Sequence, residues 1–574
     1  MQIQYSLSFP APHTHYVEVT MSIKQITQDA LQLKMPVWTP GSYLIREFQK
    51  NIDFVEVTYN NNTTQRVQKT NKNTWIVDTK NQSEININYK IYCFEYSVRT
   101  NFVDDSHALI NGAATYLYVV GEEESSVEVS INPHSTWQNI STSLNTKENN
   151  KWIRTAANLD ELVDSPIEIG NHISYFFEVE NVHHEIAMYG KSNCDIEKLI
   201  ADLKSIIEEE IKIFGAHPCS NYVFIIHNTN NSYGGLEHKN SSVNHVTRWS
   251  YDDENYQKAI SLLAHEYFHL WNVKRIRPTT LIPYNYEVEN YTDTLWFFEG
   301  VTSYYDDYIC YRAGVTSLRN YLSIVENNLE DALNTAGADT QTLAESSFDT
   351  WLKYYRRDEH SNNAQISYYK QGAIVAMLFD FIIIKETNGE KCLDDVMQSL
   401  YSDYLQNPNE GIDEAKLIRV FTSVSGIDFA PIYHKFIHTT ATIKPAAYFN
   451  ALDLNLNSFS PDNSIHLGMK TKWENGRLIV TELDKNYGAY QSGININDEI
   501  IAIDNFRTDK DYKKLFEGKS LNHSITFLLS RNGIIKTIDV KLSEDKRKKY
   551  SITQNSNKKD FTDKYILKWL GQIL

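Results

Sequence analysis

The spacing of the apolar residues changes twice along this chain, and those changes limit its fold more than any other feature of the sequence. From the start to about residue 175, apolar and polar residues alternate. Alternation with a period of two is typical of strands that bury one face. We therefore predict an N-terminal β-sandwich-like domain. The alternating apolar positions include Val17, Val19, Met21, Ile23, Leu31, Leu33, Ile85, Ile87, Val127 and Val129.

From about residue 195 the apolar residues follow helical spacing, which predicts a mainly helical middle part. Beyond about residue 455 the pattern indicates strands again, and Asn532-Gly533 between two apolar runs is a strong hairpin signal. The end of the chain carries an amphipathic segment, which we expect to dock on the body as a helix rather than to anchor in a membrane. Its apolar residues are Ile566, Trp569, Leu570 and Ile573. The predicted helices cover 255–272, 294–313, 316–334 and 366–387, and the predicted late strands cover 477–483, 498–503, 524–530 and 534–542.

These patterns together predict a multidomain α+β chain. Its 574 residues exceed what one hydrophobic core supports. We assign an N-terminal β domain to residues 1–175, a mainly helical domain to 176–452, a smaller β domain to 453–545, and a linker with a terminal helix to 546–574.

Composition argues against several classes of partner and location. The formal net charge of -18 at pH 7 would repel nucleic acid and anionic membranes, so we expect neither as a partner. Five cysteines without a Cys-x-x-Cys pair predict neither a disulfide framework nor a thiolate metal site, and they fit a reducing compartment. No apolar segment reaches the length of about 18 residues that a membrane span needs. The first residues alternate in polarity, unlike a signal peptide, so we expect a cytoplasmic protein, unless a leader precedes this sequence.

The motif His265-Glu266-Tyr267-Phe268-His269 places two histidines four residues apart within a helical pattern. This spacing puts both imidazoles on one face of the helix, opposite the apolar face that would pack. Two neutral imidazoles suit Zn²⁺, and Glu266 projects beside the metal as a candidate general base. The alternative is that the histidines only pack or cap, because a short motif also occurs by chance.

A catalytic zinc site needs a third protein ligand and one position open for water. Glu299 stands in an aromatic run, residues 295–302, that is otherwise typical of a buried helix. An unpaired buried carboxylate costs several kcal/mol, so a cation is expected to meet it. We take that cation to be one Zn²⁺ per chain, bound by His265, His269 and Glu299. A salt bridge from Glu299 to a nearby Arg or Lys is the alternative.

These residues resemble the PDZ-bearing gluzincin metallopeptidases of the glycyl-aminopeptidase type. The resemblance rests on residues 265–272 with Arg277-Pro278 after them, on 296–305, and on two further motifs, and it covers nearly the whole chain. It implies a mainly helical, thermolysin-like zinc peptidase domain between an N-terminal β domain and a C-terminal PDZ-like domain. It also implies Glu299 as third zinc ligand and peptide substrates with a small first residue, such as Gly or Ala.

The first further motif contains Gly234, Gly235 and Glu237. Paired glycines let another backbone approach closely, and a following carboxylate can meet a cation. The resemblance identifies this stretch as the exopeptidase motif, in which these three residues bind substrate and Glu237 holds the free α-ammonium. That role predicts removal of one residue at a time from an N-terminus. A glycine turn with a solvated glutamate is the alternative.

The second further motif is Tyr368-Tyr369-Lys370-Gln371-Gly372, at the start of a predicted helix. The resemblance implies that a tyrosine hydroxyl here donates a hydrogen bond to the oxyanion. By its distance from Gly372, Tyr369 matches best and Tyr368 is the reserve. The family pattern usually has lysine directly before that glycine, whereas Gln371 stands here. A packing role for either ring is the alternative.

The residues together predict peptide hydrolysis by a zinc-activated water. Zinc would lower the pKa of its water to about 7, and Glu266 would take the water proton and pass it to the leaving amine. Zinc and Tyr369 would share the charge of the tetrahedral intermediate. We therefore expect a zinc aminopeptidase. A zinc endopeptidase on the same scaffold and a non-catalytic adaptor that binds peptides are the alternatives.

In the C-terminal region, Leu467, Gly468 and Met469 with the strands after them look like part of a PDZ domain. In such a domain these three residues would form the loop whose amides receive the C-terminal carboxylate of a peptide ligand. A β domain used only for packing or dimerisation is the alternative. The N-terminal stretch 38–43 (WTPGSY) also resembles the family, without a role that its residues reveal.

Overall fold

The structure is a computed structural model that describes residues 1–252, 255–460, 465–516, 518–521, 523–554 and 564–571. The chain forms two compact units. Unit 1 comprises Met1–Tyr291, Tyr305–Thr316 and Met397–Asp413, and unit 2 comprises Thr292–Tyr304, Ser317–Val396 and Glu414–Leu574.

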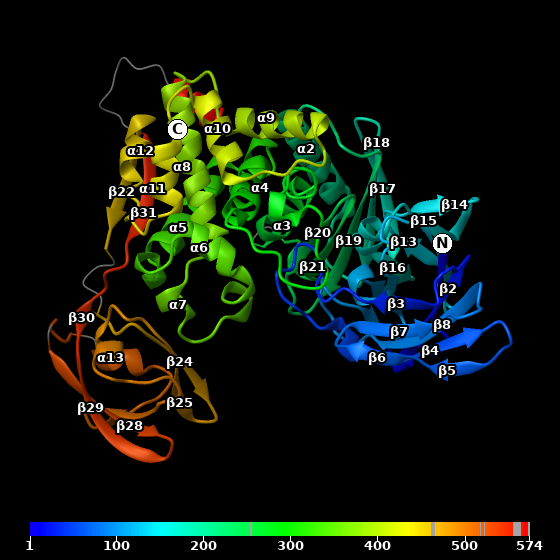
Figure 1. Cartoon of the computed structure of the whole chain (residues 1–574). Helices are drawn as coiled ribbons and strands as arrows, with labels where there is room; N and C mark the ends of the chain where they lie inside the picture. The colour runs from blue at the N-terminus through cyan, green and yellow to red at the C-terminus, as the bar shows by residue number, and fades with distance from the viewer. Residues whose placement is uncertain (253–254, 461–464, 517, 522, 555–563, 572–574) are drawn as a thin grey trace. The chain divides into compact units, whose positions relative to one another are not determined.

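The N-terminal part of unit 1 consists of three β-sheets, in agreement with the alternating pattern (Figure 1). The largest has the strand order β14-β15-β12-β1-β2-β8-β4-β5. Strand β2 (Tyr16–Lys24) buries every second residue and pairs with β8 (Glu84–Tyr92), which sets Met21 opposite Ile87. The buried faces of the sheets share one hydrophobic core. The other strands are β1 (Gln2–Ser8), β3 (Ala30–Lys34), β4 (Ile52–Tyr59), β5 (Thr64–Arg66), β6 (Gln68–Asn71), β7 (Thr74–Asp78), β9 (Phe102–Val103), β10 (His107–Ile110), β11 (Tyr118–Val119), β12 (Val127–Asn132), β13 (Asn139–Ser141), β14 (Asn145–Lys147), β15 (Asn150–Ala156) and β16 (Ile167–Gly170).

Unit 1 also contains a five-stranded sheet with the order β17-β18-β19-β21-β20. Its three inner strands run parallel, and β20 lies antiparallel at the edge. Helices α2 and α3 pack together, and α3 also contacts β20 and β21. The hydroxyl of Tyr267 on α3 hydrogen-bonds His184 Nε2 at 2.8 Å and His217 Nε2 at 2.5 Å, which ties the helix to the sheet. The elements are β17 (Ile173–Val179), β18 (Val182–Tyr189), β19 (Asn221–Thr229), β20 (Gly234–His238), β21 (Ser241–Thr247), α1 (Leu159–Val163), α2 (Ile196–Phe214) and α3 (Tyr256–Phe268).

Helix α3 confirms the helix predicted over 255–272, but it ends four residues earlier, at Phe268. The guanidinium of Arg275 donates to the carbonyl of Leu270 at 2.7 Å and to that of Lys239 at 2.9 Å. Arg275 therefore satisfies a carbonyl just past the helix end and links this turn to the β20–β21 connection.

The other three predicted helices lie between residues 292 and 396, where Tyr305–Thr316 belong to unit 1 and the rest belong to unit 2. The first begins as a π-helical turn, η5 (Trp296–Val301), and continues directly into α4 (Thr302–Arg312). The second is α5 (Leu318–Leu333) and the third is α8 (Lys370–Glu386), which is buried over most of its length. A Cβ at Gly300 would lie 2.6 Å from Cα of Gly372, so the two glycines let η5 and α8 approach closely. Further helices are α6 (Leu343–Phe348), α7 (Ser361–Ala364), α9 (Leu393–Gln406), α10 (Glu414–Ser425), α11 (Ala430–Ile437) and α12 (Ala446–Ala451).

The C-terminal β region of unit 2 has its own core and a sheet with the order β24-β25-β26-β28-β29. The hairpin predicted from Asn532-Gly533 is confirmed, since both residues have the positive φ, 52° and 81°, that such a turn needs. Its strands are β22 (Leu454–Phe459), β23 (Ile465–His466), β24 (Met469–Glu474), β25 (Arg477–Leu483), β26 (Glu499–Ile503), β27 (Phe506–Arg507), β28 (Ser524–Arg531), β29 (Ile534–Lys541), β30 (Ser543–Glu544) and β31 (Lys549–Gln554), with one short helix, α13 (Gly488–Gln491).

The terminal helix α14 (Lys564–Leu570) docks on unit 2 as predicted. Trp569 is 1% exposed, and its ring meets that of Phe381 on α8 edge-on at 4.7 Å. Ile573, the fourth apolar residue of the predicted segment, lies outside the described residues. Among the described helices, none is both long and apolar enough to cross a membrane.

Candidate functional site

The two histidines of α3 face each other through their Nε2 atoms, which lie 3.1 Å apart. Each ring is oriented by a hydrogen bond at its other nitrogen. His265 Nδ1 donates to Oδ2 of Asp306 at 3.0 Å, and His269 Nδ1 donates to the carbonyl of Asn272 at 2.7 Å. With these acceptors, each ring carries its proton on Nδ1, and Nε2 is the nitrogen that can act as a metal ligand.

The donor set fits zinc. In a tetrahedral site with zinc–nitrogen bonds of about 2.0–2.1 Å, two ligand nitrogens lie about 3.3 Å apart. The observed 3.1 Å therefore needs only a small adjustment. The acceptors behind both rings, a carboxylate and a carbonyl, are those that zinc-bound histidines use in other proteins.

Glu266 lies between the histidines in sequence, and it is 5% exposed. Its carboxylate lies against the backbone of Gly235 on the edge strand β20, where a Cβ would come within 2.1 Å of Glu266 Oε1. Gly235 therefore has a structural reason in this contact, whereas a Cβ at Gly234 would meet nothing within 4 Å, and what favours glycine there is a φ of +139°. Glu266 therefore lies between α3 and β20.

Glu237 lies two residues further along β20 and is 4% exposed, so the alternative of a solvated glutamate is wrong. Ligand atoms of Glu237, Glu266 and His269 all lie within 4.8 Å of one another. Among the described residues, Oε1 of Glu237 has no hydrogen-bond partner. A buried carboxylate oxygen without a donor, next to a second carboxylate, is a favourable position for a cationic group.

The N-terminal domain contributes to this site through the stretch 38–43, whose role the sequence left open. Gly41 has a φ of +85°, and a Cβ there would lie 2.5 Å from Oε1 of Glu237. The backbone of this loop therefore forms a wall beside the Glu237 carboxylate.

A buried ionic group holds β20 in place next to Glu237. Asp164 Oδ1 accepts hydrogen bonds from His238 Nδ1 and from Lys274 Nζ, each at 2.9 Å. Burial alone would raise the pKa of Asp164, but the charge of Lys274 and the His238 hydrogen bond lower it to about 2. Asp164 is therefore ionised at neutral pH and joins the N-terminal domain to β20 and to the segment after α3.

Unit 2 brings Glu299 and the two candidate tyrosines together. Glu299 on η5 is 2% exposed, as the aromatic run around it predicted. Tyr368 is fully buried and its hydroxyl accepts a hydrogen bond from Thr350 at 3.0 Å, whereas Tyr369 is half-buried at the start of α8. Burial first, and then the Glu299 carboxylate, raises the pKa of Tyr369 well above its usual value, so its hydroxyl keeps its proton.

The three residues of the predicted peptide-carboxylate loop lie at the start of β24 in the C-terminal β region. Leu467 and Met469 are buried in the core of that region, and Gly468 has a φ of +69°. The carbonyls of Leu467 and Gly468 accept hydrogen bonds from the amides of Ala489 and Asp484. These two carbonyl groups of the loop are therefore already hydrogen-bonded within the C-terminal β region.

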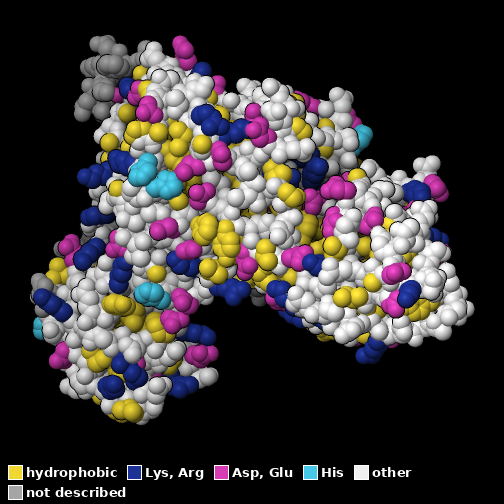
Figure 2. Space-filling view, viewed as in Figure 1, with side chains coloured by type: hydrophobic (Ala, Val, Ile, Leu, Met, Phe, Trp, Pro, Cys, Tyr) yellow, Lys and Arg dark blue, Asp and Glu magenta, His cyan; other side chains and the backbone are white. Residues whose placement is uncertain are grey.

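Sequence reasoning missed two residues at this site. Asp306 follows Glu299 by seven residues on one helical segment, and that spacing of about two turns was a usable signal. Gly41 gave no such signal, because it lies far from Glu237 in sequence and contacts it only through the tertiary fold. On the face shown in Figure 2, basic and acidic side chains of the described residues are interspersed.

Two segments of the chain match known domain models. Residues 4–171 match the Peptidase M61 N-terminal domain, and residues 258–375 match the M61 glycyl aminopeptidase. A search of curated proteins found no match.

The structure is also similar to solved structures. An aminopeptidase N family protein from Idiomarina loihiensis is 27% identical, with 99% of this chain and 100% of that chain covered and a TM-score of 0.92. An M1 zinc metallopeptidase from Deinococcus radiodurans is 10% identical, with 78% of this chain and 95% of that chain covered and a TM-score of 0.49.

The second matched segment, 258–375, contains the histidine pair, Glu266, Glu299 and both tyrosines. The chain is therefore a zinc metallopeptidase of the aminopeptidase type, similar to the M61 glycyl aminopeptidases in its N-terminal domain and in the segment that carries its metal-binding helix.

Proposed function

We propose that this aminopeptidase removes small N-terminal residues, Gly or Ala, from peptides, with one catalytic zinc bound by His265, His269 and Glu299. The observation that carries the proposal is the group formed by Glu237, Glu266 and His269. It sets a buried carboxylate oxygen without a donor beside a second carboxylate and one histidine of the metal pair. A free α-ammonium at Glu237 would bring the first peptide bond next to Glu266 and the metal.

Helical geometry supports Glu299 as the third ligand. Glu299 precedes Asp306 by seven residues on a helical segment that runs unbroken from η5 into α4. Residues about two turns apart project from similar faces of a helix. Asp306 accepts a hydrogen bond from His265, so one helical segment carries both Glu299 and a residue that orients the histidine pair. His265, His269 and Glu299 also form one of the residue groups that could hold a metal ion.

Glu237 provides the preference for a free N-terminus. Its carboxylate is buried and one oxygen lacks a donor among the described residues, so binding an ammonium would supply the missing partner. The Gly41 backbone closes the space beside it. The description of the matched M61 model as a glycyl aminopeptidase supports a small first residue.

Glu266 serves as the general base and then as the general acid. Zinc, when bound, lowers the pKa of water to about 7 and polarises the scissile carbonyl. Glu266 accepts the proton of the attacking water and passes it to the leaving amine, and such a positioned group contributes about 10²–10⁴-fold.

Tyr369 donates a hydrogen bond to the oxyanion. Its raised pKa keeps the hydroxyl protonated at neutral pH, and its side chain is half-buried, whereas that of Tyr368 is buried. Loss of one such donor costs about 2.7–4 kcal/mol of transition-state stabilisation.

The C-terminal β region is proposed to be a PDZ-like module that binds the C-terminus of a peptide. Strand β24, which begins at Met469, is an edge strand of its sheet, and an added peptide strand needs such an edge. Gly468 precedes it in the left-handed conformation.

A panel of aminoacyl-anilides, assayed with and without a chelator, tests the proposed function. We expect hydrolysis of the Gly and Ala anilides, loss of that hydrolysis with the chelator, and none of N-acetyl-Ala anilide. Equal rates of hydrolysis of free and N-acetylated substrates would overturn the assignment of Glu237. Hydrolysis that persists in the chelator would overturn the assignment of a catalytic metal.

A further inference from the structure

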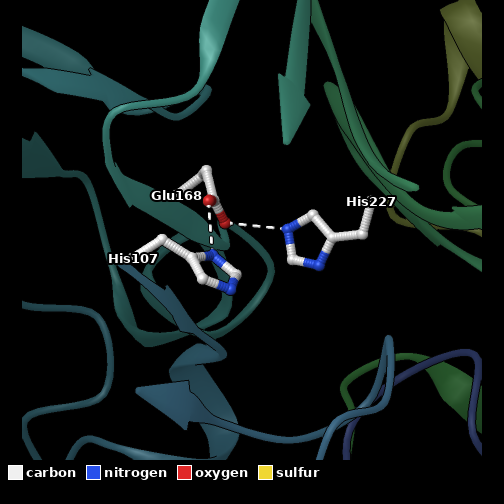
Figure 3. Close-up of side chains that lie close together, drawn as sticks. All are labelled: His107, Glu168 and His227. Atoms are coloured by element: carbon white, nitrogen blue, oxygen red, sulfur yellow. Dashed lines mark hydrogen bonds and ion pairs between the residues drawn. The ribbon is translucent and has the colours of Figure 1, made fainter. Parts of the chain in front are cut away.

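A second cluster of metal-ligand residues lies in unit 1, away from α3. His107 on β10, Glu168 on β16 and His227 on β19 point their side chains toward one another (Figure 3). Glu168 Oε1 lies 2.8 Å from His107 Nδ1, and Oε2 lies 2.9 Å from His227 Nε2. All three side chains are 0% exposed.

We propose that His107, Glu168 and His227 bind a second divalent transition-metal ion of the Zn²⁺ class. This ion would join the N-terminal domain to the five-stranded sheet of unit 1. One ligand atom from each residue lies within 4.8 Å of the other two. Two imidazoles and a carboxylate favour Zn²⁺ over Ca²⁺ or Mg²⁺, which prefer shells of oxygen ligands.

The charge of the cluster supports a cation. Both oxygens of the Glu168 carboxylate accept hydrogen bonds, and the ionised form of a carboxyl group is the one that accepts at both oxygens. Its two oxygens are met by two imidazoles, which carry no net charge when each has a single proton. A bound divalent ion would neutralise this buried negative charge.

The ring nitrogens can make the required exchange of protons. Without an ion, His107 Nδ1 and His227 Nε2 donate to Glu168. When these two nitrogens bind an ion, each ring moves its proton to its other nitrogen, and no proton needs to leave the cluster. Those other nitrogens, His107 Nε2 and His227 Nδ1, are buried and have no hydrogen-bond acceptor among the described residues, so the free energy of metal binding must exceed the cost of an unsatisfied N–H on each ring.

The surroundings hold the ligands in place, and a cavity lies beside one of them. Tyr189 stacks on the His107 ring at a centroid distance of 3.5 Å, and Tyr96 stacks on His227 at 5.6 Å. Gly170, opposite His107 in the strand pair, has no room for a side chain, because a Cβ would lie 2.7 Å from His107 Cβ. A cavity of about 680 Å³ lies beside the cluster and is lined by His107, Tyr96 and Tyr189.

Zinc counting on the full-length protein tests this proposal. The protein, free of any affinity tag, is stripped with a chelator, dialysed against Zn²⁺ and analysed by elemental mass spectrometry. We expect about two zinc ions per chain, and about one in a His265→Ala/His269→Ala double variant, which leaves the second cluster intact. Wild-type protein with only one ion, or a double variant with none, would overturn the proposal.

The substitution Glu168→Gln provides the complementary measurement. The amide keeps the size of the side chain and one acceptor oxygen, but it removes the charged ligand. We expect this variant to retain about one zinc per chain and the hydrolysis of Gly anilide, and to lose part of the rise in melting temperature that zinc gives the wild type. The matched control is His183→Ala, which removes a largely exposed histidine and should retain both ions. Zinc content of Glu168→Gln equal to that of the wild type would contradict the assignment. The proposed catalytic function is judged separately, by hydrolysis.

Discussion

A Cβ atom at Gly41 would lie 2.5 Å from Oε1 of Glu237, so the backbone of the N-terminal domain lies directly against the carboxylate that we assign to the substrate amine. This contact connects two parts of the chain that are far apart in sequence. The N-terminal domain therefore forms part of the wall of the proposed substrate site.

Substitution of Gly41 by alanine should impair substrate binding. The new methyl group would displace the Glu237 carboxylate, and we expect kcat/KM for Ala anilide to fall at least about tenfold, mainly through KM. The left-handed backbone conformation at this position also destabilises the alanine variant by about 1 kcal/mol relative to glycine. Gly121→Ala is the matched control, because Gly121 has a φ of +91° with nothing within 4 Å of its Cβ position. Equal kinetics of the two variants would exclude the proposed contact effect.

Removal of the charge of Glu237 should lower kcat/KM more than the Gly41→Ala substitution does. In Glu237→Gln the substrate ammonium would lose a buried charged partner, which typically costs about 2–5 kcal/mol. We expect kcat/KM for free aminoacyl-anilides to fall by about 10²-fold or more, with zinc content unchanged. Steady-state kinetics and zinc analysis of the same preparation check this. Wild-type kinetics would show that another group binds the ammonium.

Asp306 should act on zinc affinity through His265. Because its carboxylate accepts the Nδ1 proton of His265, Asp306→Ala should weaken zinc binding at the catalytic site by about 10–100-fold. Asp307→Asn is the control. Burial and the neighbouring Asp306 raise the pKa of Asp307 to about 7, so an amide is a close substitute there. Zinc needed for half-maximal reactivation of the stripped enzyme is the measurement, and an unchanged value for Asp306→Ala would contradict the role.

The Asp164 network should make stability depend on pH at the acidic end. The pKa of Asp164 is about 2 in the folded protein and about 3.9 in an unfolded chain. Its ionic interactions therefore stabilise the fold fully above about pH 4, and this contribution is lost as the pH falls through about 2. Between pH 5 and pH 3 we expect the difference in unfolding free energy between wild type and Asp164→Asn to narrow by about 1 kcal/mol. Urea unfolding at both pH values measures it, and a constant difference would refute the account.

Glu266→Gln should separate metal binding from chemistry. The amide is nearly the same size as the carboxylate but cannot accept the water proton, so we expect zinc content like that of the wild type and a loss of at least about 10²-fold in kcat. Elemental analysis and anilide assays on one sample decide the outcome. Full activity with bound zinc would rule out Glu266 as the base.

Local patterns in the sequence predicted most of the elements, because they follow from periodicity. The alternation at Val17, Val19 and Met21 corresponds to β2, and the spacing of His265 and His269 places both rings on one face of α3. The end of α3 at Phe268 was not predicted, since Arg275 caps that turn through a contact made only in the folded chain.

The parts of the candidate site and of the second cluster that the sequence did not reveal depend on long-range contacts. Glu168 meets His107 and His227 only after three strands from two regions have come together. The Gly41–Glu237 contact likewise joins two regions of the chain. Asp306 is different, since its helical spacing from Glu299 could have been recognised in advance.

The most direct test of the central claim is a zinc titration of the chelator-stripped enzyme, followed by hydrolysis of Gly anilide, with wild type and Glu299→Gln compared. If Glu299 is a metal ligand, the variant needs at least about tenfold more zinc for half-maximal activity, because a neutral amide replaces a charged ligand. If both proteins regained activity over the same range of zinc concentrations, this result would contradict the proposed metal site.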